Sequence, residues 1–599
     1  MDITTAPIRD PRYAARRLEV DRRDDGSVLL HNPTPVASTW MTTLEALAHW
    51  AMATPGRVWL AERSGAGWRT VTFAEARDRV AALAGGLQNL GLGRPSPLLI
   101  LARNGIDHAL IAFAAMSQGI PIAAVSPQYG LAGADLNRLA HAVALLAPGA
   151  VFVDDAAAFA VALEADFLAG LPVIAGANAR PEDVALEALM SAPPAPCIAA
   201  ADDIAKLLLT SGSTGKPKAV IALHRAVAIN AAQVTACYDD PEPPVVVNQA
   251  PWSHSLGANA ILQMVLHRGG ALYIDAGQPV AGRNRPTIDN LKLIAPTYHN
   301  MVPAGWDLMA GELERDPDLA RTFFSRVRVL QYGGAAMGQS LCDRIQAVAV
   351  RTVGERISFA SGYGATETGP TATNVHWPNQ TMGLLGLPLP GTTVKLTPSQ
   401  GRLEFRVKGP QVSPGYFNAP EATAAAFDDE GFYRLGDAAR FADPERPEAG
   451  LMFDGRLSEN FKLASGTFVN AGAIRVAAVS AIGGAATDAV VCGEGEVGIG
   501  LLIFLNAPFC RTLAGPEPAT PWDHPAVIDA VRAGLERFNA GASGGARIAR
   551  ALILEDAPDA PSGEITDKGY INQTLSRARR AEDIARLFAT PPGPEVMAL

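Results

Sequence analysis

The chain alternates between segments with an apolar residue at every third or fourth position and short runs that are apolar throughout. From Thr42 the segment TTLEALAHWAMATPG has the helical spacing and stops at Pro55-Gly56. A strand-like segment, WRTVTF, and a second helical one, AEARDRVAALAGGLQNLG, follow it. The alternation continues to about residue 450, and it predicts an α/β architecture with largely parallel sheets.

The pattern changes at the charged, proline-bearing stretch FADPERPEAGLMFDGR, which ends at Arg456. We therefore expect a large N-terminal domain, residues 1–455, and a small α+β C-terminal domain, residues 456–599. In the second domain, Ala489–Ala507 predicts buried strands, and Pro525–Asn539 and Asn572–Phe588 predict amphipathic helices. Residues 1–40 predict an arm lying on the body, and the tail ATPPGPEVMAL is expected to fray.

Composition narrows the classes of function. A hydrophobic content of 48% and a charged content of 18% describe a globular, soluble protein, and the net charge of -10 argues against broad nucleic-acid binding. The five cysteines show no CxxC pair, which argues against a disulfide framework or structural zinc. Neither a signal peptide nor an apolar run of ~18 residues is evident, so a cytoplasmic protein without a membrane span is expected.

The stretch LLLTSGSTGKPKAV, Leu207 to Val220, has the composition of a loop that binds phosphate through backbone N–H groups. It is not a Walker A loop, because Gly212 and Gly215 are three positions apart and Lys216 is followed by Pro217 instead of serine or threonine. Taken alone, it could equally be a plain surface turn.

The string TSGSTGKPK resembles the phosphate loop of the adenylate-forming superfamily, which includes acyl-CoA synthetases, adenylation domains and luciferases. Four further segments match superfamily motifs in the same order: GGA at 333–335, SGYGATETG at 361–369, YRLGD at 433–437 and FDGRLSENFK at 453–462. The chain is therefore identified as a member of this superfamily. The resemblance implies ATP and Mg²⁺ as ligands and a C-terminal domain that moves relative to the N-terminal one.

The resemblance also implies roles for individual residues. Tyr363 would stack on adenine, Thr366 would contact the α-phosphate, Glu367 would help to hold Mg²⁺, and Asp437 would accept hydrogen bonds from the ribose hydroxyls. The complete implied ATP site is Thr210, Ser211, Gly212, Ser213, Thr214, Gly215, Lys218, Gly333, Gly334, Ala335, Tyr363, Gly364, Ala365, Thr366, Asp437 and Arg456. Arg456 would reach the ribose or the phosphates, and Ser458 would stand at the hinge.

Several longer segments resemble bacterial feruloyl-CoA synthases: LHNPTPV, GIPIAAVSPQYG, FDGRLSENFKLASGTFVNAG and GEITDKGYINQ. This implies that a hydroxycinnamate such as ferulate is converted to an acyl-adenylate, with release of pyrophosphate, and then to its thioester with coenzyme A. The implied acyl-binding residues are His254, Tyr298, Gly333 and Gly364. For His254, which lies in PWSHSLG, a histidine packed at the start of a helix is the alternative interpretation.

The sequence departs from the superfamily pattern near its end. The motif that normally ends in a catalytic lysine reads PSGEITDK here, with Glu564 at the lysine position, where a carboxylate would repel both anionic substrates. Lys568 is the nearest replacement. FKLASGTFVNAG is one residue longer than the usual spacing, which leaves the role of Lys462 less defined; the thioester half-reaction is the role expected for it. The expected catalytic set is Lys568, Thr366, Glu367 and Lys462.

Three alternatives remain open at the level of sequence. The acid could be another aromatic or a medium-chain acid, or the chain could be a stand-alone adenylation enzyme that loads a carrier protein. Glu564 alone supports the third alternative, an ATP-binding pseudoenzyme. The expected partners are small molecules, namely an aromatic carboxylic acid, ATP and CoA, and a homodimer is left open.

Overall fold

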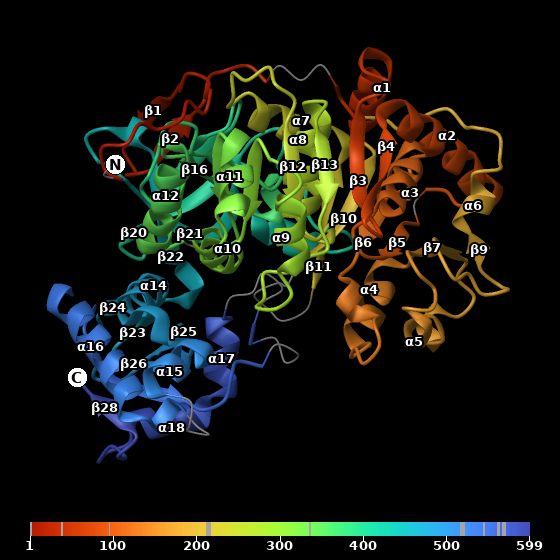
Figure 1. Cartoon of the computed structure of the whole chain (residues 1–599). Coiled ribbons are helices and arrows are strands. Elements are labelled where there is room, and N and C mark those ends of the chain that lie inside the picture. The colour runs from red at the N-terminus through yellow and green to blue at the C-terminus, as the bar shows by residue number, and fades with distance from the viewer. Residues whose placement is uncertain are drawn as a thin grey trace. The chain divides into compact units, whose positions relative to one another are not determined.

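The chain divides into two compact units in a computed structural model that describes residues 3–36, 40–94, 96–210, 217–334, 337–515, 521–542, 546–559, 564–565 and 571–599. The first unit consists of Met1–Thr397, Arg406–Leu435 and Phe441–Met452. The second unit consists of Pro398–Phe405, Gly436–Arg440 and Phe453–Leu599. Figure 1 colours both along the chain. The domain boundary at Arg456 stays a prediction.

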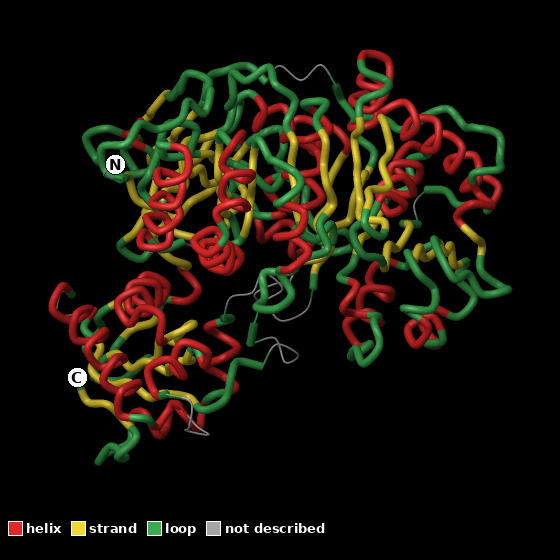
Figure 2. The backbone as a smooth tube through the Cα atoms, in the orientation of Figure 1, coloured by secondary structure: helices red, strands yellow, loops and turns green. Residues whose placement is uncertain are grey.

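The first unit contains a mainly parallel sheet with the order β11-β10-β6-β5-β7-β8-β9, and only the β10–β11 pair among these strands is antiparallel. Its strands are β5 (Leu98–Leu101), β6 (Ile122–Ala124), β7 (Ala150–Val153), β8 (Val173–Ala175), β9 (Val184–Ala185), β10 (Ile204–Thr210) and β11 (Lys218–Leu223). Parallel strands need crossover connections, so helices alternate with strands along the chain, as the hydrophobic pattern predicted. Figure 2 shows this alternation of helix and strand.

Helices of the first unit pack on its sheets (Figure 1). They are α1 (Thr43–Ala53), α2 (Phe73–Asn89), α3 (Ile106–Ser117), α4 (Asn137–Leu146), α5 (Ala160–Leu163), α6 (Leu186–Leu189), α7 (His224–Thr235), α8 (Leu262–His267), α9 (Arg285–Leu291), α10 (Pro303–Arg315), α11 (Pro317–Arg326), α12 (Gln339–Val353) and α13 (Pro420–Ala426). The side chain of Thr72 caps α2 in a capping box with Glu75, which explains why the helix begins there.

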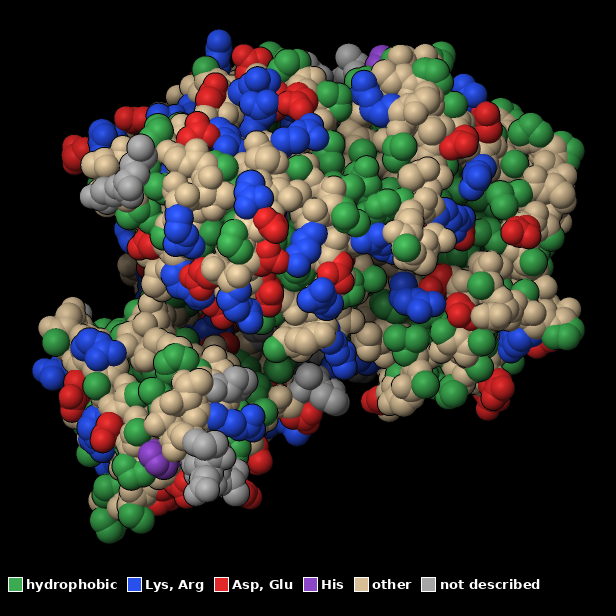
Figure 3. Space-filling model, in the orientation of Figure 1, with side chains coloured by type: hydrophobic (Ala, Val, Ile, Leu, Met, Phe, Trp, Pro, Cys, Tyr) green, Lys and Arg blue, Asp and Glu red, His purple; other side chains and the backbone are tan. Residues whose placement is uncertain are grey.

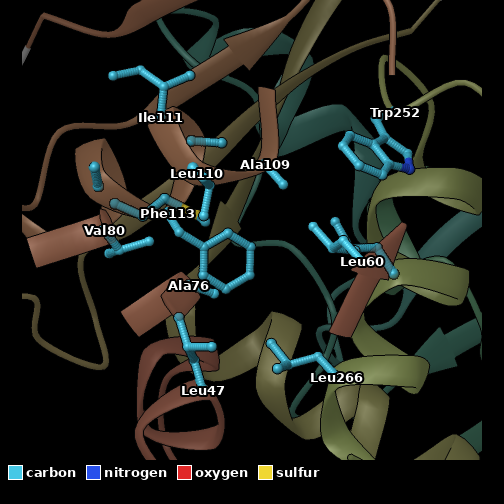
Figure 4. Packing of buried hydrophobic residues seen from close by; sticks show 14 of the residues in the cluster. Leu47, Leu60, Ala76, Val80, Ala109, Leu110, Ile111, Phe113, Trp252 and Leu266 are labelled. Atoms are coloured by element: carbon cyan, nitrogen blue, oxygen red, sulfur yellow. The ribbon is translucent and has the colours of Figure 1, made fainter. Parts of the chain in front are cut away.

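A smaller sheet has the order β12-β13-β3-β4, with β3 (Val58–Ser64), β4 (Gly67–Thr72), β12 (Val245–Asn248) and β13 (Ala271–Ile274). The main apolar core joins this sheet to α1, α2, α3 and α8. In Figure 4, Phe113 from α3 lies between Val80 on one side and Leu60, Trp252 and Leu266 on the other. The segment that carries Trp252 is therefore anchored in the core.

The longest sheet has the order β1-β2-β19-β20-β21-β22-β18-β17-β16-β15-β14. Its strands are β1 (Glu19–Arg22), β2 (Val28–His31), β14 (Tyr298–Met301), β15 (Val329–Tyr332), β16 (Ser358–Tyr363), β17 (Thr373–Asn374), β18 (Leu384–Pro388), β19 (Thr393–Ser399), β20 (Arg402–Lys408), β21 (Tyr433–Phe441) and β22 (Leu451–Arg456). The strands β14, β15 and β16 are parallel. Strands β1 and β2 belong to the N-terminal arm, and the sequence pattern did not predict them.

The second unit has the α+β organisation expected of it, with a sheet of order β25-β26-β27-β28. Its elements are β23 (Phe461–Lys462), β24 (Phe468–Val469), α14 (Ala471–Ile482), β25 (Ala486–Cys492), β26 (Ile499–Leu505), α15 (Ala507–Ala514), α16 (Pro525–Gly541), β27 (Ile548–Leu554), α17 (Gln573–Arg579), α18 (Ala581–Phe588) and β28 (Val596–Ala598). The α14–α16 pair and the sheet enclose a separate apolar core.

Two expectations for the second unit were wrong. The predicted helix Asn572–Phe588 is interrupted at Arg580, which lies between α17 and α18 and whose guanidinium binds Glu564. The tail does not fray at Val596–Ala598, because these residues form β28 against β27 and bury Val596 and Met597. Burial of two apolar side chains and pairing of the backbone offset the entropy cost of ordering the strand.

The surface of the molecule carries both signs of charge. Lysine, arginine and acidic side chains lie interspersed over the face drawn in Figure 3. Within the part of the chain that the structure describes, no helix combines the length and apolarity needed to cross a bilayer.

Candidate active site

The predicted phosphate loop connects the antiparallel strands β10 and β11, whose register pairs Thr210 with Lys218. The interior side chains of β10, including Leu207 and Leu208, are fully buried, so the hairpin holds both ends of the loop in place. The Nζ of Lys218 lies 5.0 Å from the ring centre of Tyr416. The predicted residues Ser211, Gly212, Ser213, Thr214 and Gly215 lie outside the described residues.

The segment after β16 turns sharply at Gly364. A Cβ on this residue would lie 2.2 Å from the Pro370 carbonyl oxygen and 2.6 Å from Thr368 Oγ1, so only glycine fits. The turn continues into a short 3-10 helix, Thr366–Thr368, and the amide of Ala365 donates a hydrogen bond of 2.8 Å to Thr368 Oγ1. The backbone geometry therefore presents Thr366 and Glu367 in a defined orientation directly after Tyr363.

Glu367 carries a buried carboxylate that is held by a phenol. Tyr416 Oη donates a hydrogen bond of 2.9 Å to Glu367 Oε1, and Tyr433 Oη lies 3.0 Å from Tyr416 Oη. Burial, followed by the nearby negative charge of Glu367, raises the pKa of both phenols well above the usual range, so both stay protonated. Tyr416 uses its proton for Glu367, so the second hydrogen bond is donated by Tyr433.

The carboxylate of Glu367 is not paired with a cationic side chain of the described residues. No lysine, arginine or histidine of the described residues forms an ion pair with it, although the side chain is only 9% exposed. Mg²⁺ is commonly held by one or two carboxylates together with substrate phosphates. Glu367 therefore fits the magnesium role that the motif implied.

The predicted acyl-binding segment meets the nucleotide motif directly. Ser255 Oγ lies 3.1 Å from Thr366 Oγ1, and a Cβ on Gly333 would lie 3.8 Å from Leu256 Cδ1. His254 precedes these residues, is partly buried, and accepts the amide of Ala258 at its carbonyl. Gly334 adopts φ +81°, which favours glycine, at the point where the chain leaves β15. Ala335 lies outside the described residues.

Tyr298 lies on β14 and is buried in a polar cluster. Its hydroxyl donates to Gln331 Oε1, and Asn300 Nδ2 donates to the same oxygen at 2.9 Å. The Nε2 of Gln331 lies 3.4 Å from the position of a Cβ on Gly362. The cluster therefore connects the end of β15, immediately before Gly333, with β16, immediately before Tyr363.

Sequence reasoning did not assign Ser255, Gln331, Tyr416 or Tyr433. A signal was available for Ser255 and Tyr433, which lie inside the quoted motifs PWSHSLG and YRLGD, and for Gln331, which precedes GGA by two positions. Nothing in the sequence marks Tyr416, which reaches Glu367 only through the fold.

The remaining predicted residues belong to the second unit. Asp437 and Arg456 form an ion pair of 3.3 Å, and Asp437 is 9% exposed. Lys462 ends the short strand β23, where its Nζ lies 4.5 Å from the ring centre of Phe468. Ser458 lies in a 3-10 helix, Leu457–Glu459. Lys568 lies outside the described residues, so its role stays a prediction.

Glu564 is neutralised inside the second unit. Its side chain accepts hydrogen bonds from Arg580 Nε at 2.9 Å and Nη2 at 3.0 Å, and from the Asp559 amide at 2.8 Å. Burial alone would raise the pKa of Glu564, but these hydrogen bonds outweigh it and hold the pKa below its usual range. The charge of Glu564 is therefore balanced by Arg580, while the expectation that Glu564 repels both substrates and the pseudoenzyme alternative stay predictions.

Replacing Glu564 tests this structural role. Glu564→Ala removes two hydrogen bonds from the partly buried Arg580 guanidinium and leaves it Asp583 at 3.8 Å, so the free energy of unfolding of the second unit should fall by about 2 kcal/mol. Urea denaturation followed by hydrogen exchange of β27 and α17 measures the loss. Glu582→Ala, an exposed residue on α18, is the matched control and should change stability by less than about 0.5 kcal/mol. Equal stability of the two variants would contradict the role.

Comparisons with known proteins agree with this geometry. A family model described as "AMP-binding enzyme" matches residues 47–417. The chain is 26% identical over 407 residues to a 4-coumarate–CoA ligase of Pinus taeda, covering 64% of this chain and 71% of that protein. It is 29% identical over 451 residues to a carboxylic acid reductase of Mycobacterium marinum, covering 67% of this chain and 37% of the reductase.

A solved structure, ATP-bound MatB from Rhodopseudomonas palustris, matches with a TM-score of 0.71 and 18% identity, covering 91% of this chain and 99% of MatB. At this identity the likeness shows the fold alone. The family model spans more than half of the chain, so the superfamily predicted from the motifs is confirmed: the chain belongs to the AMP-binding enzyme family.

Proposed function

We propose that the protein is an ATP-dependent acid–CoA ligase that converts a hydroxycinnamate such as ferulate, through an acyl-adenylate, to its CoA thioester with release of pyrophosphate and AMP. One observation carries the proposal: Thr366 contacts Ser255 of the acyl-side segment, while its neighbour Glu367 binds Tyr416, over which Lys218 of the loop hairpin lies. The nucleotide and acyl halves of the site thus meet at two adjacent residues.

The chemistry explains why the nucleotide half and the acyl half of the site must lie next to each other. A carboxylate must attack the α-phosphate of ATP, and both reactants are anions, so the site must supply cations and fixed hydrogen-bond donors where negative charge accumulates. Lys218 supplies charge beside the loop, and the Thr366 hydroxyl is placed to donate to the α-phosphate. Magnesium, when bound, would neutralise the polyphosphate. The chain's own contribution there is the fixed carboxylate of Glu367.

The acyl side favours a flat phenolic acid. Leu256 and Gly333 provide apolar contact for a ring, whereas Tyr298, Asn300 and Gln331 form a buried polar cluster at the end of β14 and β15. Buried pockets for phenols combine apolar walls with a few hydrogen-bonding groups for the ring substituent. The amide of Gln331 is suited to bind a phenolic hydroxyl, which a medium-chain fatty acid does not offer.

A panel of acids tests the proposed function. Purified protein with ATP and Mg²⁺ should release pyrophosphate with ferulate and coumarate at least tenfold faster than with benzoate or octanoate, and CoA should convert the adenylate to a thioester. Preference for octanoate would replace the proposed acid by a medium-chain one. Adenylation without transfer to CoA would favour loading of a carrier protein, and ATP binding without pyrophosphate release from any acid would favour a pseudoenzyme.

The carboxylate of Glu367 and its phenol partner, Tyr416, should contribute unequally to the rate of adenylation. Glu367→Gln keeps the shape but removes the charge, so adenylation should fall by about two orders of magnitude or more and its dependence on magnesium concentration should weaken. Tyr416→Phe removes the hydrogen bond to Glu367 and the one from Tyr433, and it should cost about tenfold in the rate of adenylation. Tyr273→Phe is the control, because its hydroxyl makes no hydrogen bond with the described residues. A Glu367→Gln enzyme with the normal rate would contradict the assignment.

We also propose that Lys568 supplies the cation at the acyl end and that Lys462 serves thioester formation. Lys568→Ala should depress adenylation strongly while thioester formation from pre-made feruloyl-adenylate stays nearly intact, and Lys462→Ala should do the reverse. Both half-reactions are measured separately, with the exposed Lys408→Ala as control. If Lys568→Ala adenylates at the normal rate, Lys462 becomes the next candidate for the adenylation step.

A further inference from the structure

A lysine lies in the interior of the first unit, outside every motif. Lys206 belongs to β10, four positions before Thr210, and is 3% exposed. Its Nζ donates a hydrogen bond of 3.0 Å to the Ala258 carbonyl and one of 2.9 Å to Asn259 Oδ1. Burial of an ammonium group is unfavourable because the group loses its hydration, whereas an apolar side chain would fill the space without this loss.

The surroundings of Lys206 provide no counter-charge. Within the described part of the chain, no acidic side chain forms an ion pair with it, and it borders an apolar cavity of about 20 Å³ lined by Phe113, Leu208, Trp252 and Leu262, among others. Burial lowers the pKa of Lys206 to about 7. The titratable groups that face it are His108 on α3 and His224 on α7, and burial lowers the pKa of both imidazoles to about 4.

Both hydrogen bonds of Lys206 end on an irregular piece of helix. Residues Leu256–Ile261 form a π-helix, a wider turn than the α-helix and one that occurs frequently at functional sites. Gly257 is packed so closely on the preceding chain that a Cβ would lie 2.4 Å from the Ala250 carbonyl oxygen. The turn is therefore held by the two hydrogen bonds of Lys206 and, near its start, by the close packing of Gly257.

The other side of the same turn contacts the candidate active site. Ser255, immediately before the π-helix, lies 3.1 Å from Thr366 through its hydroxyl, and Leu256, its first residue, lies next to Gly333. If the π-helix became a regular α-helix, the helical turn would lose one residue. The residues before it would rotate about the helix axis by about 100°, and both contacts would be displaced.

We propose that Lys206 is a positioning residue for the acid-binding half of the site: its ammonium group holds the π-helical turn Leu256–Ile261 so that Ser255 and Leu256 keep their places beside Thr366 and Gly333. Lys206 touches neither the substrate-facing side of the turn nor the nucleotide motif, so it acts through the turn alone. The inference rests on the proposed function in so far as this half of the site binds the acid.

Kinetics of Lys206→Met distinguish positioning from simple packing. The variant keeps the length of the side chain but cannot donate, so the KM for the acid should rise tenfold or more while the KM for ATP changes less than twofold. Lys206→Gln, which keeps a donor, should restore part of the affinity for the acid. Leu208→Met, on the same strand and the same cavity, is the matched control and should behave as the wild type. Equal increases of both KM values would overturn the proposal.

The pH profile gives a second readout. The ammonium form donates the stronger hydrogen bonds and is populated below pH 7, so the wild-type KM for the acid should be lowest there and rise between pH 7 and 8.5 as Lys206 loses its proton. His108 and His224 stay neutral throughout this window. The ratio of the Lys206→Met value to the wild-type value should therefore decrease as the pH rises. A ratio independent of pH would contradict a role for the charge.

Amide hydrogen exchange tests the holding of the turn even if no acid of the panel is activated. Exchange over residues 252–262 should become at least tenfold faster in Lys206→Met and remain unchanged in Leu208→Met, with thermal unfolding recorded for both. Unchanged exchange in Lys206→Met would overturn the proposal. A wild type that activates no acid while the exchange result holds would overturn the proposed function and leave the positioning of the turn established.

Discussion

The arrangement of the first unit depends on a buried negative charge, the carboxylate of Glu367. Tyr416 donates to one of its oxygens, and burial keeps both Tyr416 and Tyr433 protonated, so the carboxylate is oriented without being neutralised. A salt bridge would have stabilised the group more simply, but it would have consumed the charge. A carboxylate held by neutral phenols remains available to a cation that arrives with the polyphosphate.

A buried lysine contacts the segment that carries Ser255. Lys206 donates to a carbonyl oxygen and an amide oxygen, and no carboxylate of the described residues forms an ion pair with it. Thr366, the neighbour of Glu367, and Lys206 contact opposite ends of one segment, because Ser255 Oγ lies 3.1 Å from Thr366 Oγ1 and the Ala258 carbonyl accepts a hydrogen bond from Lys206 Nζ. In the proposed function, this turn of a few residues connects the acid-binding residues with the nucleotide-binding ones.

In the second unit, by contrast, a buried carboxylate is paired with a cationic side chain. Glu564 and Arg580 neutralise each other in a bidentate pair that is nearly inaccessible to water. Such a pair contributes local order at the junction of α17 and α18. The role of a residue at a motif position therefore depends on the side chain with which the fold pairs it, as well as on its place in the motif.

The hydrophobic periodicity and the order of the motifs in the sequence predict many of the helices and strands and the family of this protein. The apolar runs and helical spacings of the first 125 residues correspond to α1, α2, α3, β4, β5 and β6, since burial of one face requires that period whatever the surroundings. The motif order was sufficient for the family, because loops that bind a nucleotide need the same residue types at the same spacing.

Contacts between distant segments needed the tertiary structure. Tyr416 reaches Glu367 across 49 residues and Lys206 reaches Ala258 across 52, and no local pattern encodes such pairs. The same reason explains the tail, which pairs with β27 although its composition favours disorder, and Glu564, whose charge is cancelled by an arginine 16 positions away.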